Sequence, residues 1–309
     1  MSVSKWAWLF IIALFFVFLL PISGWSENID NEMVTSKNRD YIGELKKWEP
    51  RANAGDFEAQ YNLGLMFELG LGVEQDLKEA AHWYSLSAAQ GFDMAQVNLG
   101  QMYRKGEGVN KNIETAIELF LRAARQNNPM AEFNLGVMFE EGKSVSQNYQ
   151  KAEYWYALSA SKNFPNAQYN LAQMYLLGKG VQRDLNAARD LWTRAAEQGH
   201  AGAQYNLGVM YDQGTGVKQD LKQAFLWYKR AAKKGYGLAQ FSLGVMYLYG
   251  DGVEKDLVNS YLWFSLAEMN RVKNTSSALI KVKEQMTSKD FNKAEKALQV
   301  CKTKGFIDC

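Results

Sequence analysis

Cysteine and histidine are scarce in this chain, which has two of each among its 309 residues. Cys301 and Cys309 lie within the last nine residues, and His82 and His200 are far apart in sequence. Two thiols without further ligands do not make a zinc site, so we expect no metal and no other cofactor. In an exported protein an even pair this close predicts a disulfide that pins the tail and contributes about 2–3 kcal/mol. The alternative is two free thiols on a frayed end.

An excess of either charge is also missing. Lysine and arginine number 35 against 33 aspartates and glutamates, for a formal net charge of +2, and there is no block of basic residues. This balance argues against nucleic acid or an anionic membrane surface as the main partner.

Long apolar runs are limited to one, from Trp6 to Leu20, which follows Lys5 and precedes small residues. This order predicts a secretory signal peptide over residues 1–26, followed by a linker over residues 27–40. The run would form a helix of about 22 Å, shorter than the roughly 30 Å hydrocarbon core of a bilayer. Cleavage is therefore favoured over the alternative, an uncleaved membrane anchor.

A lipid anchor on a bacterial lipoprotein cysteine is not expected, because no cysteine directly follows the apolar run. No second run is long enough to cross a bilayer, so we expect a mature chain that does not span the membrane. The expected location is outside the cytoplasm, either periplasmic or fully secreted.

What the chain has in abundance is a repeated phrase, Ala-Gln-Tyr-Asn-Leu-Gly with small variations, at a constant spacing of 36 residues. A fixed period of this length predicts a solenoid, in which each unit contacts only its neighbours and the body offers one long surface. Binding is therefore the first expectation, ahead of catalysis. The six copies begin at Ala59, Ala95, Ala131, Ala167, Ala203 and Ala239.

Each repeat has the pattern of a helical hairpin. Apolar residues from Ala59 to Phe67 recur with helical spacing, Gly70 can end that helix, and a second apolar stripe begins at Leu77. Asp76 precedes the second stripe and can accept bonds from the free amides of its first turn. The equivalents of Asp76 are Asn112, Asn148, Asp184, Asp220 and Asp256.

Two further positions define the array. Gly64 falls in the middle of the first helix and recurs in five of six repeats, with Ala172 in the other, which suggests that another helix backbone approaches closely. The position after the second helix holds glycine or asparagine five times and Arg271 once, and we expect the array to end there because arginine does not favour a left-handed cap.

The predicted fold is all-α, with six repeats over residues 55–270. Residues 41–54 have the pattern of an N-terminal capping half-repeat, and residues 271–309 of C-terminal capping helices with a disulfide-pinned tail. Those helices are expected from Thr275 to Met286 and from Ser288 to Lys302. Such caps are what an open stack needs to remain soluble.

These motifs resemble Sel1-like repeats, relatives of the tetratricopeptide repeat. The resemblance lies in the Ala-Gln-Tyr-Asn-Leu-Gly phrase, in the Gly-x-Gly-Val turn from Gly70 to Val73, and in the stretch from Asp220 to Tyr228. It implies a right-handed α/α superhelical solenoid and a non-enzymatic adaptor that binds another protein or a peptide, in exported bacterial members as a scaffold of the cell envelope. A cysteine-rich branch linked to penicillin binding carries a paired cysteine in each repeat, which this chain lacks.

A row of asparagines is the main candidate for partner binding. Asparagine is a poor mid-helix residue, and the resemblance implies that the first helix lines a concave face, where amides could bind a peptide backbone. The alternative is that each amide bonds a neighbouring helix or turn. The row consists of Asn62, Asn98, Asn134, Asn170 and Asn206, and ends at Ser242. Beside it lie Tyr61, Phe133, Tyr169, Tyr205 and Phe241, which could edge the same groove.

Two enzyme-like matches are better explained by the repeat. Ser159 and Lys162 fit the Ser-x-x-Lys motif of β-lactamases and penicillin-binding proteins, but no Ser-Asp-Asn or Lys-Thr-Gly accompanies them, and Ser159 occupies a small-residue packing position. Gly142 to Ser144 imitates a phosphate loop with the wrong spacing from Gly136.

No reaction is assigned. A penicillin-recognising hydrolase and a polysaccharide or peptidoglycan scaffold remain the alternatives.

Overall fold

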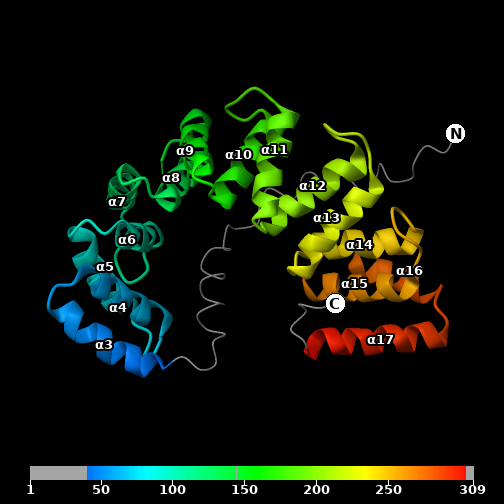
Figure 1. Ribbon diagram of the computed structural model, residues 1–309, viewed down its shortest axis with the longest axis horizontal. Helices are drawn as coiled ribbons and strands as arrows, with labels where there is room; N and C mark the ends of the chain where they lie inside the picture. The colour runs from blue at the N-terminus through cyan, green and yellow to red at the C-terminus, as the bar shows by residue number, and fades with distance from the viewer. Residues whose placement is uncertain (1–39, 144, 304–309) are drawn as a thin grey trace. The chain divides into compact units, whose positions relative to one another are not determined.

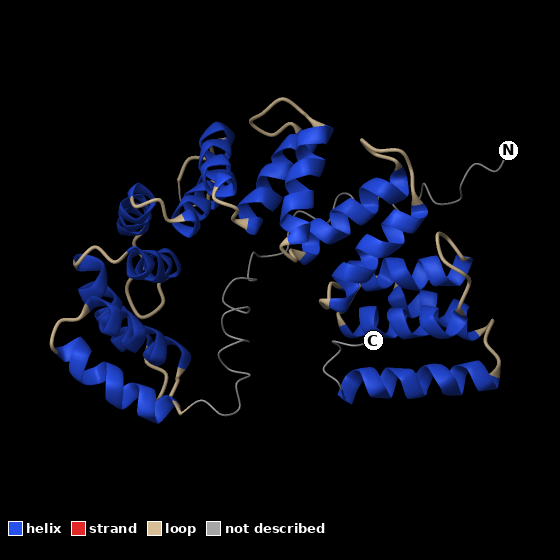
Figure 2. Ribbon diagram, in the orientation of Figure 1, coloured by secondary structure: helices blue, strands red, loops and turns tan. Residues whose placement is uncertain are grey.

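The computed structural model describes residues 40–143 and 145–303. These residues form fifteen α-helices, and the described part of the chain contains no strand (Figure 2). The all-α prediction is confirmed. The predicted signal peptide, nearly all of the predicted linker, and Cys309 lie outside the described residues.

The helices follow the predicted hairpin pattern, with one helix before the repeats and two after them. The first helices of the six repeats are α4 (Phe57–Leu69), α6 (Asp93–Lys105), α8 (Pro129–Glu141), α10 (Pro165–Leu177), α12 (Ala201–Gln213) and α14 (Gly237–Tyr249). The second helices are α5 (Leu77–Ala89), α7 (Ile113–Arg125), α9 (Tyr149–Ser161), α11 (Leu185–Glu197), α13 (Leu221–Lys233) and α15 (Leu257–Met269). The flanking helices are α3 (Tyr41–Asn53), α16 (Thr275–Lys283) and α17 (Ser288–Thr303).

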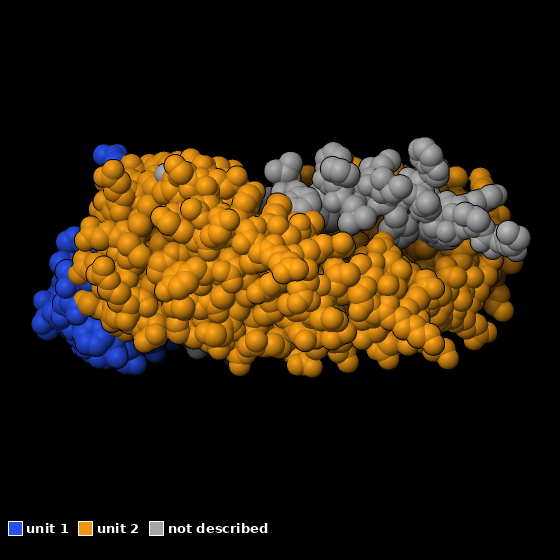
Figure 3. Space-filling view, turned by 90° about the horizontal axis from the view of Figure 1, so that it is seen from above, with its two compact units in different colours: residues 1–90, 106–110 blue, residues 91–105, 111–309 orange. Residues whose placement is uncertain are grey.

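The chain divides into two compact units (Figure 3). In the unit that holds α3 to α5, α4 packs against both of its neighbours. In the unit that holds α6 to α17, each first helix packs against its second helix, and the second helices α7, α9, α11 and α13 pack against the next first helix (Figure 1). The helices α16 and α17 cover α15. The repeats thus stack as an all-α solenoid.

Helix boundaries follow from the capping residues that the sequence indicates. The carboxylate of Asp76 accepts the amides of Lys78 and Glu79, and each of its five equivalents likewise accepts at least one first-turn amide. Gly70 ends α4 in the left-handed conformation, with φ of 68°. Arg271 also adopts positive φ, at 56°, so the expectation that it does not take a left-handed cap is wrong. The array nevertheless ends there, since the helices that follow, α16 and α17, differ in length from the repeat helices. The amide of Val272 closes the turn on the carbonyl of Ala267, as at the equivalent turns.

The mid-helix glycine row confirms a close approach, but the neighbouring group is a ring and not helix backbone. A Cβ atom at Gly136 would lie 2.5 Å from the ring of Tyr156, which belongs to the second helix of the same repeat. The other four glycines of the row face the equivalent aromatic at 2.5–2.7 Å. In the repeat that has Ala172, the equivalent aromatic is Trp192.

The two helices of a repeat differ in exposure. All residues from 131 to 138 of α8 are buried, whereas α13 buries only Ala224, Tyr228, Ala231 and Ala232. Solvent therefore meets mainly the second helices and the loops of the repeats. The exception is α15, where residues 260–267 are buried.

Candidate functional site

From the third repeat onward, the asparagine row contacts the preceding repeat. The side-chain oxygen Oδ1 of Asn134 accepts a hydrogen bond from Nε2 of Gln101 on α6 at 2.8 Å. Nδ2 of Asn170 donates to the hydroxyl of Tyr156 on α9 at 3.0 Å. Asn206 hydrogen-bonds the side chain of Tyr169 on α10. These contacts match the alternative in which the amides join neighbouring helices.

The remaining members are placed differently. Asn62 donates to the carbonyl of Glu58 in its own helix at 2.8 Å, and this bond lies at the exposed surface. Asn98 is half-buried. Ser242, at the end of the row, hydrogen-bonds Tyr205 and Tyr228. Peptide binding by the row stays a prediction, and the side-chain bond of Asn62 to Glu58 stays within its own helix.

Asn134 and Asn170 differ in their bonds because they differ in the residue fourteen positions earlier. Asn170 has Tyr156 at that position and donates to its hydroxyl. Asn134 has Phe120 there, and its Nδ2 is buried without a hydrogen-bond partner in the described part of the chain. An aromatic without a hydroxyl at this position thus offers the asparagine Nδ2 no acceptor.

The buried tyrosines also bond acidic residues, which was not predicted from the sequence. The hydroxyl of Tyr156 donates to Glu140 at 2.6 Å, and that of Tyr228 donates to Asp212 at 3.2 Å. Burial raises the pKa of both carboxyls, and the bond from the tyrosine opposes that rise. The signal was available, because acids occur sixteen residues before the tyrosines Tyr84, Tyr156 and Tyr228 and not before Phe120, Trp192 and Phe264.

The aromatic row beside the asparagines packs largely within the hairpins. Phe133 and Tyr205 are buried, and their rings lie 5.8 Å and 5.6 Å from those of Tyr156 and Tyr228. Phe241 lies 5.2 Å from Phe264 in the same way.

Tyr61 and Tyr169 are half-buried. Tyr169 stacks on His200 with ring centroids 4.5 Å apart, and Tyr61 lies 5.8 Å from Tyr84. A role for Tyr61, Tyr169 and Tyr205 at a groove edge stays a prediction.

The Ser-x-x-Lys match has a packing role. Ser159 is fully buried, and its hydroxyl donates to the carbonyl of Pro129 at 2.7 Å. Lys162 forms an ion pair with Glu132, whose side chain is 0% exposed. A serine bonded to a backbone carbonyl and a lysine held by a carboxylate do not form a nucleophile and its base. In the phosphate-loop imitation, Gly142 is the left-handed cap of α8, and Ser144 lies outside the described residues.

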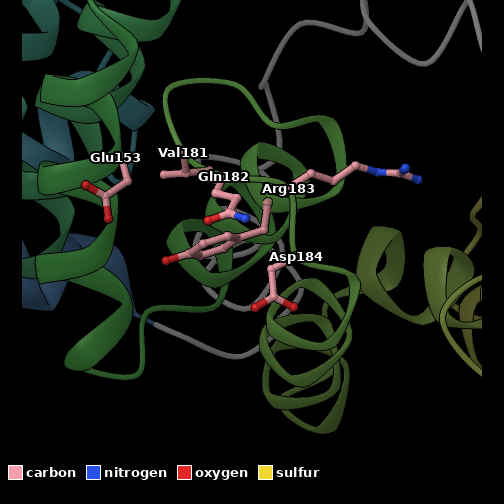
Figure 4. Close-up of a pocket in the computed structure, with 6 residues that line it drawn as sticks. Glu153, Val181, Gln182, Arg183 and Asp184 are labelled. Carbon is pink, nitrogen blue, oxygen red and sulfur yellow. The ribbon is translucent and has the colours of Figure 1, made fainter.

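A polar cleft of about 500 Å³ lies where α9, α10 and the loop before α11 meet (Figure 4). It is lined by Glu153, Tyr175, Val181, Gln182, Arg183 and Asp184. Nε of Arg183 donates to the carbonyl of Leu176 at 3.0 Å, and Asp184 accepts the amides of Asn186 and Ala187 as the cap of α11. The guanidinium of Arg183 extends away from Glu153 in Figure 4.

Comparison with the fifth repeat explains the cleft. The positions of Glu153 and Tyr175 correspond to those of Phe225 and Tyr247, two rings that pack edge-on with centroids 5.5 Å apart. Glutamate in place of the phenylalanine leaves that space open and polar. The cleft can accept a polar side chain, and it contains no pairing of a nucleophile with a base. Among the described residues no group of three or more His, Cys, Asp or Glu could hold a metal ion.

Two further features concern membrane crossing and the predicted disulfide. No helix in residues 40–143 or 145–303 is long and apolar enough to cross a membrane. Cys301 is buried near the end of α17, but Cys309 lies outside the described residues, so the bridge between them stays a prediction.

Comparisons with known proteins agree on the repeat. The Sel1 repeat model matches six successive segments, residues 57–92, 93–128, 129–164, 165–200, 201–236 and 237–270. The structure resembles that of a Sel1 repeat protein from Oxalobacter formigenes at 33% identity and a TM-score of 0.72, covering 79% of this chain and 99% of the other. Comparison with curated proteins finds no match.

A second solved relative is a protective antigen present in uropathogenic Escherichia coli strains, which displays an SLR fold. It is 32% identical with a TM-score of 0.53, and the match covers 85% of this chain. The chain spans 64% of that protein.

Proposed function

Because the chain belongs to the Sel1 repeat family, we propose that it is a non-enzymatic adaptor or scaffold that binds another protein or a peptide. Proteins of this family are typically protein-interaction scaffolds. The observation that carries the proposal is the row of six in-phase repeats whose buried polar side chains join helix to helix. Glu132 with Lys162, and Glu140 with Tyr156, are such pairs, and neither is arranged to react with a substrate.

The proposed binding surface is the first-helix side of the repeats, the expected concave face. Two features support it. Asn62, Asn98, Asn170 and Asn206 are half-buried, so part of each side chain still meets solvent. The cleft beside Glu153 and Tyr175 adds a recess for a partner side chain. Each is a modest contact, and a long repeated surface sums many such contacts.

The proposed location is the bacterial cell envelope, in the periplasm or after secretion. The apolar run from Trp6 to Leu20 supports export. The solved relative that is a protective antigen of a bacterial pathogen supports a bacterial setting. Mass spectrometry of the chain recovered from its cells tests the export signal. A new N-terminus after Ser26 is expected, and an intact N-terminus in the cytoplasmic fraction contradicts the proposed location.

Crosslinking in intact cells tests the scaffold function. A photo-crosslinking amino acid is placed at Leu177, which is 40% exposed at the end of α10, with the same substitution at Met269, 51% exposed at the end of α15, as the control. We expect one protein to be captured at Leu177 and not at Met269. Equal capture of many abundant proteins at both positions contradicts a specific partner.

The asparagine row offers a sharper test through Asn62. Among the described residues its side chain bonds only the carbonyl of Glu58, four residues earlier in the same helix, so Asn62→Ala removes a surface amide without breaking a link between the described helices. We expect unchanged thermal stability together with weaker partner capture. Asn134→Ala and Asn170→Ala are the comparison, because both also break helix-to-helix bonds. Full capture by Asn62→Ala contradicts peptide binding by the row.

A further inference from the structure

The exposed face of α13 carries basic residues and no acid. Lys222, Arg230 and Lys233 are exposed and Lys229 is half-buried, and there is no aspartate or glutamate from Leu221 to Lys233. The four bases fall at i, i+7, i+8 and i+11, which places them on one side of a helix. We call these four residues together with Leu226 the α13 basic face.

The charges of this face have no counter-ion in the described part of the chain. No ion pair joins any of the four bases to a carboxylate there. Two other second helices carry both signs of charge: α7 mixes Glu114 and Glu118 with Arg122 and Arg125, and in α11 Arg189 pairs with Asp190 at 2.9 Å. Like charges one turn apart repel, so α13 retains a local cost that an opposite charge would remove.

Apolar and aromatic groups lie among these bases. Leu226, at i+4 on the same stripe, is 49% exposed. The guanidinium of Arg230 lies 4.5 Å from the centre of the Trp227 ring, and the ammonium of Lys229 lies 5.7 Å from that of Phe225. Trp227 also packs against a buried core cluster, so it holds Arg230 in a defined position. The α13 basic face thus combines ordered positive charge with one exposed apolar contact.

We propose that the α13 basic face binds an acidic peptide segment of a partner protein, with an apolar residue of that segment seated on Leu226. The proposal rests on the scaffold function and adds a second contact surface to it. From Lys222 to Lys233 the face spans about 16 Å at 1.5 Å per residue, which fits roughly three turns of an acidic helix or about five extended residues. Charge complementarity supplies orientation and the apolar contact adds affinity.

A protein segment fits this face better than an anionic membrane does. Helices that lie on membranes combine a basic side with a broad apolar side that enters the acyl layer. Here Leu226 is the one large apolar residue of α13 that is exposed. Ala224, Tyr228, Ala231 and Ala232 are buried, and Leu221, Phe225 and Trp227 are half-buried against core clusters. Little apolar surface is therefore left to insert.

The test is fluorescence anisotropy with the full mature chain and a labelled nine-residue probe, four glutamates on each side of a central leucine. We expect binding that weakens as salt is added, and a loss of about tenfold in affinity for Lys222→Glu/Arg230→Glu. The matched control is Arg122→Glu/Arg125→Glu on α7, which changes the net charge equally and is expected to alter affinity less than about threefold. Leu226→Ser is expected to weaken binding by about threefold.

Three results overturn the proposal. The first is equal binding of the glutamate probe by wild type and by Lys222→Glu/Arg230→Glu with an unchanged melting temperature. The second is an equal loss in the α7 control, because net charge alone then explains binding. The third is binding to phosphatidylglycerol vesicles without binding to the probe. The two proposals fail separately: lack of any crosslinked protein removes the scaffold function, whereas these three results remove the α13 basic face alone.

Discussion

The third repeat, residues 129–164, and the fourth, residues 165–200, build the same hairpin with different interiors. Where the third buries Glu132 and pairs it with Lys162, the fourth buries Gln168 and bonds it to Gln198 at 2.8 Å. The helices on which these residues lie have equal lengths in the two repeats. A charged pair and a neutral amide pair therefore serve the same link between the start of the first helix and the end of the second.

The same contrast continues deeper in the hairpin. The third repeat places Gly136 against Tyr156, whose hydroxyl bonds Glu140. The fourth repeat has Ala172 at the position of Gly136 and Trp192 at the position of Tyr156. A buried hydroxyl requires an acceptor, and the third repeat supplies one, whereas the fourth has Leu176 at the position of Glu140. The backbone of the repeat is therefore constant, whereas the buried side chains that contact one another change together from one repeat to the next.

The largest expected effect comes from breaking the charged pair. Lys162→Ala leaves the carboxylate of Glu132 buried and unpaired, and we expect the free energy of unfolding to fall by about 3 kcal/mol. Glu132→Gln/Lys162→Gln copies the fourth repeat and is expected to stay within about 1 kcal/mol of wild type. Urea unfolding followed by circular dichroism measures both. A double variant as unstable as Lys162→Ala would show that the two links are not interchangeable.

Removing the tyrosine hydroxyl is expected to cost less. Tyr156→Phe takes the donor from Glu140 and the acceptor from Asn170, so we expect a loss of about 2 kcal/mol. Adding Glu140→Leu, the residue of the fourth repeat, should recover about half of it because no buried carboxyl is then left unpaired.

The control for this change is Tyr175→Phe. Among the described residues the Tyr175 hydroxyl has no hydrogen bond, and we expect an effect within about 0.5 kcal/mol. Equal losses at Tyr156 and Tyr175 would contradict a specific role for the buried bond.

Much of the hairpin could be predicted from sequence because its boundaries depend on local chemistry. Asp76 and its equivalents start helices by accepting amides, and Gly70 ends one by adopting positive φ, both properties of single residue types. The glycine row predicted restricted space but not its cause, since periodicity does not show whether a ring or a backbone fills a space. In the end the ring of Tyr156 lies there.

The candidate site was less predictable because it depends on neighbours in other repeats. The direction of the Asn170 amide is set by the hydroxyl of Tyr156, fourteen residues earlier, which a row of identical asparagines does not reveal. The cleft exists because Glu153 stands where the fifth repeat has Phe225. Both signals become visible only when differences between repeats are compared as closely as their common phrase.

The glycine row gives the next smaller effect. Gly136→Ala places a Cβ atom 2.5 Å from the Tyr156 ring, and overpacking of about 1–3 kcal/mol exceeds the roughly 0.5–1 kcal/mol that alanine gains in a helix. A net loss of about 1 kcal/mol is expected in thermal unfolding. A more stable Gly136→Ala protein would show that the ring can move aside without cost.

The smallest effects are expected from pH, and they have opposite signs in the two repeats. In the third, burial raises the pKa of Glu140 above its ordinary value of 4.5, so the folded state binds more protons and gains stability as pH falls through that window. In the fourth, burial lowers the pKa of His200 from 6.5 to about 4, and Lys234 adds to the lowering. The folded state there binds fewer protons and loses stability as pH falls from 6.5 towards 4.

Two substitutions separate these contributions when melting is compared between pH 7 and pH 5. His200→Asn keeps a cap acceptor, as Asn128 does at the equivalent position, and should lose less stability on acidification than wild type. Glu140→Gln should lose more than wild type, because the gain from protonating Glu140 is gone. If both variants follow the wild-type pH curve, neither group titrates differently in the folded chain. The contrast between the two interiors would then be one of packing alone.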